Sequence, residues 1–435
     1  MGKKVLMIFS VFFGLFSVAA FAAVESVKVS GDITTYAVSR SDFNLGSQIP
    51  AAPFIADRDR VPADTVSVLA SVARLKFDAD LIEDVSARVM LVDERIWGKQ
   101  SDDIYAEEAY FTLKNFLKIP LTIKVGKQPV HLGNDVILGD FDGPTNLAAS
   151  AGSAFHAGWI DDLSPRKNPE GIVAEYDFSQ VAPLKLTSGY LKINESGSAT
   201  RDDTNIYFAN LGLIIQNYPV FELYYIARDT EHKTEKDHVE NFGGKLTIKP
   251  IDPLILAFEA VFQSQHQSPL VDPFGDPDPK SETAWLACAY AQYSFSNLPW
   301  KPALSVDFSI ATDKWDTMDE NVSVASISNA ILYDTNGMVM GATLTARPMS
   351  DLGVKLRYAN IQLWRPAKVN FSEYAYYVMT NNKHIGNEVD ASALYDYTED
   401  VQLGVEADWF LPGKAYDESN REAARQVLGT MKVSF

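Results

Sequence analysis

The chain repeats one pattern of hydrophobic and polar positions, in segments of about ten residues where apolar and polar side chains alternate. In residues 426–435, Val427, Met431 and Phe435 share one face, whereas Thr430 and Lys432 share the other. Successive side chains of a strand point to opposite faces. The period of two therefore predicts a β-strand with one apolar and one polar face.

The same alternation along the whole chain predicts an all-β protein of about 18 strands. The segments that carry it are 27–38, 66–77, 85–92, 106–114, 121–128, 171–178, 184–193, 205–215, 220–228, 242–249, 254–263, 283–295, 303–310, 338–346, 352–360, 387–397, 401–410 and 426–435.

The connections between these segments alternate between short and long. Segments such as 78–84, 250–253 and 398–400 are short and carry Pro, Asn or Asp, which favour tight turns. Segments such as 129–170 and 311–337 are long. Short periplasmic turns and long extracellular loops are typical of transmembrane antiparallel β-barrels. We therefore expect a closed barrel with an even number of strands and with both termini on the periplasmic side.

The N-terminal residues predict export from the cytoplasm. Lys3 and Lys4 precede an apolar run over residues 5–21, which ends in the small-x-small sequence Ala20-Phe21-Ala22. This arrangement predicts a signal peptide over residues 1–22 and a mature barrel over residues 23–435. A membrane anchor is the alternative, although the run is short for a span. No later apolar run is long enough for a membrane helix, so a closed barrel in the bacterial outer membrane is expected.

Contacts with lipid and with the assembly machinery are expected from the aromatic residues. Trp97, Trp285, Trp300 and Trp409 lie near predicted strand ends, where Trp favours the boundary between lipid and water. Phe435 closes the last strand, as in the C-terminal signature that the barrel-assembly machinery recognises in outer-membrane barrels. Outer-membrane lipid and this machinery are therefore the predicted partners of the outer surface and of Phe435.

Strand parity assigns many charged residues to the lumen, because the lipid face must be apolar. Inward acids and bases are about equally frequent, so we expect a water-filled lumen whose charges select the solute. Pairing of many of these charges across neighbouring strands is the alternative. The predicted pore-lining residues are Arg74, Lys76, Arg88, Lys124, Lys127, Lys355, Arg357, Glu108, Glu388 and Asp390.

Composition narrows the range of functions. The formal net charge is −19, which argues against nucleic acid as a partner. The single cysteine, Cys288, excludes an intrachain disulfide. The acidic segments 271–280 and 313–320 could supply oxygen ligands to calcium, but no EF-hand spacing is present, so no metal or cofactor is predicted.

Two stretches resemble the alginate-export family of outer-membrane barrels. The first contains DERIWG at 93–98, EEAYFTLKN at 107–115 and VGKQPVHLGNDVIL at 125–138; the second covers residues 386–413. The resemblance implies a monomeric 18-stranded barrel that passes a uronic-acid polysaccharide through a narrow, arginine-rich lumen. Arg74 and Arg95 resemble basic positions of that family. Lys127 stands where the family usually has Arg, and Lys lacks the planar fork that holds carboxylates at two points.

The predicted function is a passive channel or porin for a hydrophilic solute, anionic or saccharide in nature. A closed barrel that acts as an adhesin or ligand-binding protein through its long loops is the alternative. An enzyme is not expected: the 6 histidines form no HExxH motif, and no Gly-x-Ser-x-Gly occurs.

Overall fold

The computed structural model describes residues 26–46, 65–98, 104–139, 163, 168–194, 203–215, 218–231, 236–266, 281–318, 325–331, 336–366, 369–371 and 376–435. The predicted signal peptide, residues 1–22, lies outside these residues. Among the described residues, no helix is long and apolar enough to cross a bilayer.

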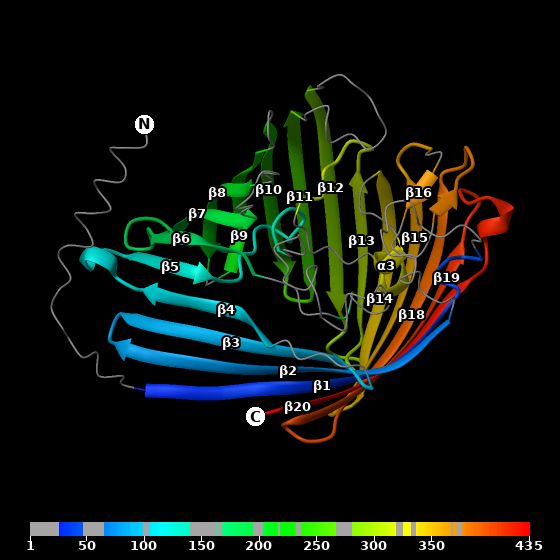
Figure 1. Ribbon diagram of the computed structural model, residues 1–435, viewed down its shortest axis with the longest axis horizontal. Helices are drawn as coiled ribbons and strands as arrows, with labels where there is room; N and C mark the ends of the chain where they lie inside the picture. The colour runs from blue at the N-terminus through cyan, green and yellow to red at the C-terminus, as the bar shows by residue number, and fades with distance from the viewer. Residues whose placement is uncertain are drawn as a thin grey trace.

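Eighteen antiparallel strands form one closed sheet (Figure 1), because β1 pairs with both β2 and β20. The strands of this barrel are β1 (Ser26–Ser41), β2 (Thr65–Ile82), β3 (Val85–Ile96), β4 (Ile104–Leu113), β5 (Leu121–Lys127), β6 (Glu170–Asp177), β7 (Leu184–Asn194), β8 (Asp203–Ile215), β9 (Tyr218–Glu231), β10 (Lys236–Ile251), β11 (Leu254–His266), β12 (Ser281–Ser294), β13 (Ala303–Ala311), β14 (Gly337–Met349), β15 (Leu352–Leu363), β18 (His384–Asp396), β19 (Val401–Pro412) and β20 (Ala424–Ser434).

The described connections add few elements. A small hairpin consists of β16 (Val369–Phe371) and β17 (Tyr376–Val378). The helical segments are η2 (Phe116–Lys118), α3 (Ser326–Ile331) and η4 (Glu418–Asn420).

Each of the 18 predicted segments corresponds to one observed strand, which confirms the predicted antiparallel barrel. The strands often extend further toward the long connections than predicted. For example, β9 ends at Glu231 and β10 begins at Lys236, so the connection predicted over 229–241 is short. Residues 236–241, KDHVEN, are too polar to show the alternation, but their backbone still pairs with β9. The hydrogen-bond ladder therefore continues beyond the apolar band that the pattern detects.

The two faces of the sheet have the predicted polarity. Phe258, Val405 and Met431 are exposed on the outer face, whereas Asp408 and Gln426 are buried on the inner face. This distribution is the reverse of that in a soluble protein and matches a wall with lipid outside and polar groups inside.

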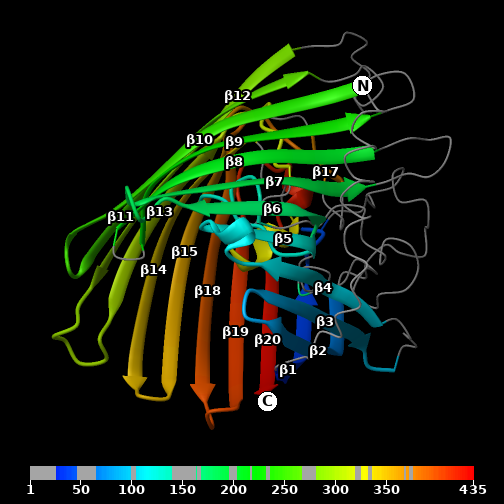
Figure 2. The same cartoon turned by 90° about the vertical axis from the view of Figure 1, so that its left-hand side faces the viewer.

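The barrel closes where the C-terminus meets β1. The backbone N–H groups of Gly31 and Phe435 each donate to the carbonyl of the other residue, at 2.9 and 3.0 Å. The Phe435 ring lies over Gly31, where a Cβ atom would come within 2.7 Å of the ring. Figure 2 shows the C-terminus beside the short β18–β19 hairpin, so the last strand ends on the side of the short turns.

Candidate functional site

The lumenal side of β1–β4 carries paired charges. The Arg74 guanidinium lies 3.6 Å from Asp32 across the β1–β2 pair. Arg88 donates to Asp78 at 2.6 Å and lies 3.6 Å from Glu108. These contacts place Arg74, Arg88 and Glu108 on the inner wall and show that each has a partner on a neighbouring strand.

Arg357 forms the best-defined lumenal ion pair. Its two terminal nitrogens donate to the two carboxylate oxygens of Asp307, at 2.7 and 2.9 Å. Thr343 accepts a further bond from Arg357 at 3.1 Å. Gly341 leaves room for the pair, since a Cβ atom there would come within 2.5 Å of Asp307. The two-point geometry makes this a rigid feature of the wall.

Three of the predicted pore-lining lysines face the lumen and form no salt bridge with another described residue. Lys124 lies opposite Thr112, Lys76 opposite Ser30, and Lys355 opposite Ser392. The Lys124 amine also lies 5.9 Å from the centre of the Tyr110 ring. None of the three forms a salt bridge within the described part of the chain.

Lys127 differs from the prediction. The register pairs Lys127 with Ala109, two residues from the exposed outer residue Phe111, so Lys127 belongs to the outer face. Its amine donates to the Ala106 carbonyl at 2.8 Å. The lumenal placement of Lys127 follows from the family resemblance alone; strict alternation from the inward Lys124 puts residue 127 on the outer face and Gln128 on the inner side, where Gln128 is buried.

Arg95 also lies on the outer face. Its register partner is Ser71, one residue before Val72, which is buried on the inner side. Arg95 is half-exposed and bonds Asp93 on its own strand at 2.7 Å. The expected correspondence of Arg95 to a lumenal base is therefore not supported by the register.

A loop segment folds into the barrel between β5 and β6. We call residues 128–138 the inner loop. Its apolar side chains pack against inward side chains of β7–β13. The residues in this contact are Val130, Leu132, Val136, Ile137 and Leu138 of the inner loop and Ile206, Phe208, Ile226, Val261 and Leu286 of the wall.

Glu259 anchors the inner loop to β11. The backbone N–H of Asn134 donates to one Glu259 oxygen at 2.9 Å, and the Tyr224 hydroxyl donates to the other at 2.5 Å. The Lys245 amine donates to the Gly133 carbonyl at 2.8 Å. Alternation along residues 242–249 and 254–263 assigns Lys245 and Glu259 to the inner face, but it does not reveal their partners in the inner loop. One feature of the sequence could have indicated them: Ile206 and Ile226 are apolar although they lie on the face expected to be polar. Apolar residues on that face indicate that another segment packs against them inside the barrel.

Helix α3 lies on the inner face of the wall, where its first residues contact three carboxylates and reach a fourth, Asp408, through Gln426. We call Glu388, Asp390, Glu406 and Asp408 the acidic patch. Glu388 accepts the backbone N–H groups of Ile327 and Ser328, at 2.5 and 2.8 Å. Glu388 and Asp390 therefore lie on the inner face of the wall, and α3 lies over Glu388, which is fully buried.

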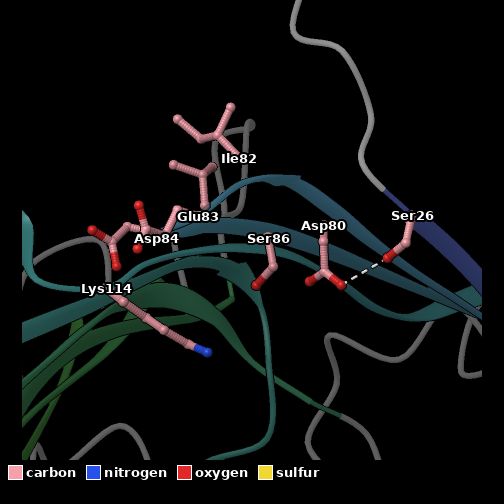
Figure 3. Close-up of a pocket in the computed structure, with 8 residues that line it drawn as sticks. Ser26, Asp80, Ile82, Glu83, Asp84, Ser86 and Lys114 are labelled. Atoms are coloured by element: carbon pink, nitrogen blue, oxygen red, sulfur yellow. Dashed lines mark hydrogen bonds between the residues drawn. The ribbon is translucent and has the colours of Figure 1, made fainter.

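The short-turn mouth contains a polar hollow of about 230 Å³ (Figure 3). Ser26, Asp80 and Ser86 occupy one row across β1, β2 and β3, and the Ser26 hydroxyl donates to Asp80 at 2.8 Å. Lys114 contributes a positive charge to the same hollow. This end of the wall is thus polar and open to water. Within the described residues, no group of three or more His, Cys, Asp or Glu side chains is arranged to hold a metal ion.

Two comparisons of the sequence with known proteins found no match. No protein-family model matches the sequence, and no curated protein matches it significantly. The resemblance to the alginate-export family therefore gains no support from the family models.

Solved structures show the same architecture. Pseudomonas aeruginosa OccK8 (OprE) is 9% identical, with a TM-score of 0.55 over 95% of this chain and 98% of that chain. Acinetobacter baumannii OccAB1 is 10% identical, with a TM-score of 0.57 over 96% and 98%. P. aeruginosa OccK2 (OpdF), solved in complex with glucuronate, is 12% identical, with a TM-score of 0.54 over 95% and 99%. At these identities the similarity establishes that this chain shares its barrel fold with outer-membrane Occ channels.

Proposed function

We propose that the protein is a passive channel in the bacterial outer membrane that admits small hydrophilic solutes. One observation carries the proposal: a closed barrel has an apolar outer face and a charged inner face. Such a wall suits lipid on one side and a hydrated path on the other. No cofactor and no catalytic residue are needed, because diffusion down a gradient supplies the driving force. Cleavage after Ala22 and assembly through Phe435 belong to the same proposal.

The solute class we favour is a small carboxylated saccharide. Lys76, Lys124 and Lys355 present unpaired ammonium groups to the lumen, and an ammonium attracts a carboxylate as a point charge. The structural relative OccK2 was solved with glucuronate, a sugar acid. The inner loop and α3 occupy part of the lumen, which favours a single sugar over a long polyuronate chain.

The test is conductance of the refolded mature chain in a planar bilayer, under a salt gradient, with glucuronate, glucose and polyuronate added in turn. We expect an open channel whose current glucuronate reduces more strongly than glucose does. Lys124→Gln should weaken the effect of glucuronate. Lys127→Gln is the matched control, because Lys127 is on the same strand but on the outer face, and it should leave the effect unchanged.

Other outcomes distinguish the alternatives. Block by polyuronate at lower concentration than glucuronate would favour polysaccharide passage, as the alginate-export resemblance implies. A folded barrel with no conductance under any condition would contradict the channel and favour an adhesin that acts through its long loops.

A further inference from the structure

Helix α3 covers the acidic patch through several polar contacts. Besides the two backbone bonds to Glu388, the Ser326 hydroxyl donates to Glu406. The Ser326 backbone N–H faces Asp390 at 3.5 Å, and Gln426 links Ser326 to Asp408 through bonds of 3.2 and 2.9 Å. The first N–H groups of a helix have no partner within the helix. Here the wall carboxylates supply those partners.

The patch needs such a cover for an electrostatic reason. Asp390 and Asp408 lie directly opposite each other on β18 and β19, an arrangement that is unfavourable for like charges. Two bases lie near the patch: Arg357 is directly opposite Asp390 in the register of β15 and β18 but bonds Asp307, and Arg40 reaches the patch only through Gln426. One oxygen each of Asp390 and Asp408 has no hydrogen-bond partner among the described residues. The wall therefore compensates the negative charge of the patch only in part, through Arg357 and Lys355 on β15, and the donors of α3 add to that compensation.

We propose that α3 is a displaceable cover, that Glu388 is the positioning residue that holds it, and that release of α3 exposes the acidic patch to the lumen. This inference rests on the proposed channel function. With α3 in place, the accessible lumenal charges include the unpaired lysines. With α3 displaced, the carboxylates also face the path, so the channel gains conductance and shifts its preference toward cations.

Two variants that each remove one carboxylate distinguish release of α3 from the effect of the lost charge on selectivity. Glu388→Gln keeps the size of the side chain but turns an amide NH2 toward a backbone N–H, so α3 should be released. Asp390→Asn removes the same charge at a weaker contact, so α3 should stay. We expect the Glu388→Gln channel to conduct more and to shift toward cations, whereas Asp390→Asn shifts toward anions. Equal shifts toward anions in both variants would overturn the proposal.

A covalent lock tests whether the gain arises from movement of α3. In a Cys288→Ser background that carries Glu388→Gln, Ser326→Cys and Gln426→Cys place one thiol on α3 and one on β20, which a short bifunctional methanethiosulfonate can join. Cross-linking should return conductance to the level of the unmodified channel, and reduction should raise it again. A channel that stays in the high-conductance state after verified cross-linking would contradict the cover.

A labelling measurement keeps this inference separate from the channel proposal. Ser328 is 1% exposed, so Ser328→Cys in the Cys288→Ser background reports on α3 without any current. A water-soluble maleimide should label Ser328→Cys about tenfold faster when Glu388→Gln is present, the factor that about 1.4 kcal/mol produces. Equal rates in barrels that remain folded would overturn the cover. Faster labelling without conductance would retain the cover and reject the channel.

Discussion

Gly133 of the inner loop touches the carboxylate of Glu259 on β11 so closely that no side chain fits between them. A Cβ atom on Gly133 would come within 2.0 Å of Glu259 Oε1, and the backbone φ of Gly133 is +63°. Position 133 thus requires glycine both for its left-handed conformation and for this contact. The close approach of Gly133 therefore lets the inner loop pack directly against Glu259.

Gly133→Ala should displace the inner loop and increase single-channel conductance. Gly98 is the matched control, because its φ is +81° but a Cβ atom there meets nothing within 4 Å. Both substitutions carry a backbone cost of about 1–3 kcal/mol. Only Gly133→Ala should change conductance, and a similar change in Gly98→Ala would attribute the effect to the backbone rather than to Glu259.

Tyr224→Phe should destabilise the barrel by about 1–3 kcal/mol, because a buried Glu259 oxygen loses its donor. Urea unfolding in lipid bilayers measures this free energy. Tyr293→Phe provides the comparison: Tyr293 is exposed on the wall and its removal should have little effect on the unfolding free energy. A stability for Tyr224→Phe equal to that of Tyr293→Phe would show that the bond contributes nothing.

Arg357 and Asp307 should behave as a coupled pair. Arg357→Gln leaves Asp307 uncompensated and should shift the reversal potential toward cations, whereas Asp307→Asn should shift it toward anions. In the double variant the two shifts should largely cancel, and the coupling in unfolding free energy should be about 1.5–3 kcal/mol. Arg95→Gln on the outer face serves as the control and should leave selectivity unchanged. Additive stability losses in the double-mutant cycle would refute the coupling.

Phe435→Ala should lower the amount of folded protein in the outer membrane. The Phe435 ring packs over Gly31 where β20 meets β1 and the barrel closes. Phe435 is also the residue predicted to be recognised by the barrel-assembly machinery. The folded fraction can be followed by heat-modifiable migration of membrane extracts in gels. Phe111→Ala removes another exposed phenylalanine from the outer face and should assemble normally. Refolding of purified Phe435→Ala in detergent separates a defect in seam packing from a defect in recognition.

The number of strands and their order could be predicted because the relevant signal is local. In β19, apolar Val405 and Trp409 alternate with Glu406 and Asp408, so ten residues suffice to identify both faces. The ends of the strands could not be predicted equally well. Residues 236–241 pair with β9 through backbone groups, and no side-chain pattern records that pairing.

The sequence by itself determined the barrel, its 18 strands and the inward face of most charged residues, since lipid requires an apolar outer face at every second position. The tertiary structure decided which of those charges remain available. Lys124 and Arg357 both face inward by parity, but Arg357 bonds Asp307, whereas Lys124 forms no salt bridge with a described residue. Glu388 and Glu259 look like open pore residues, but they hold α3 and the inner loop. Asn134 and Glu259 are 125 residues apart, so only the closed barrel brings them together.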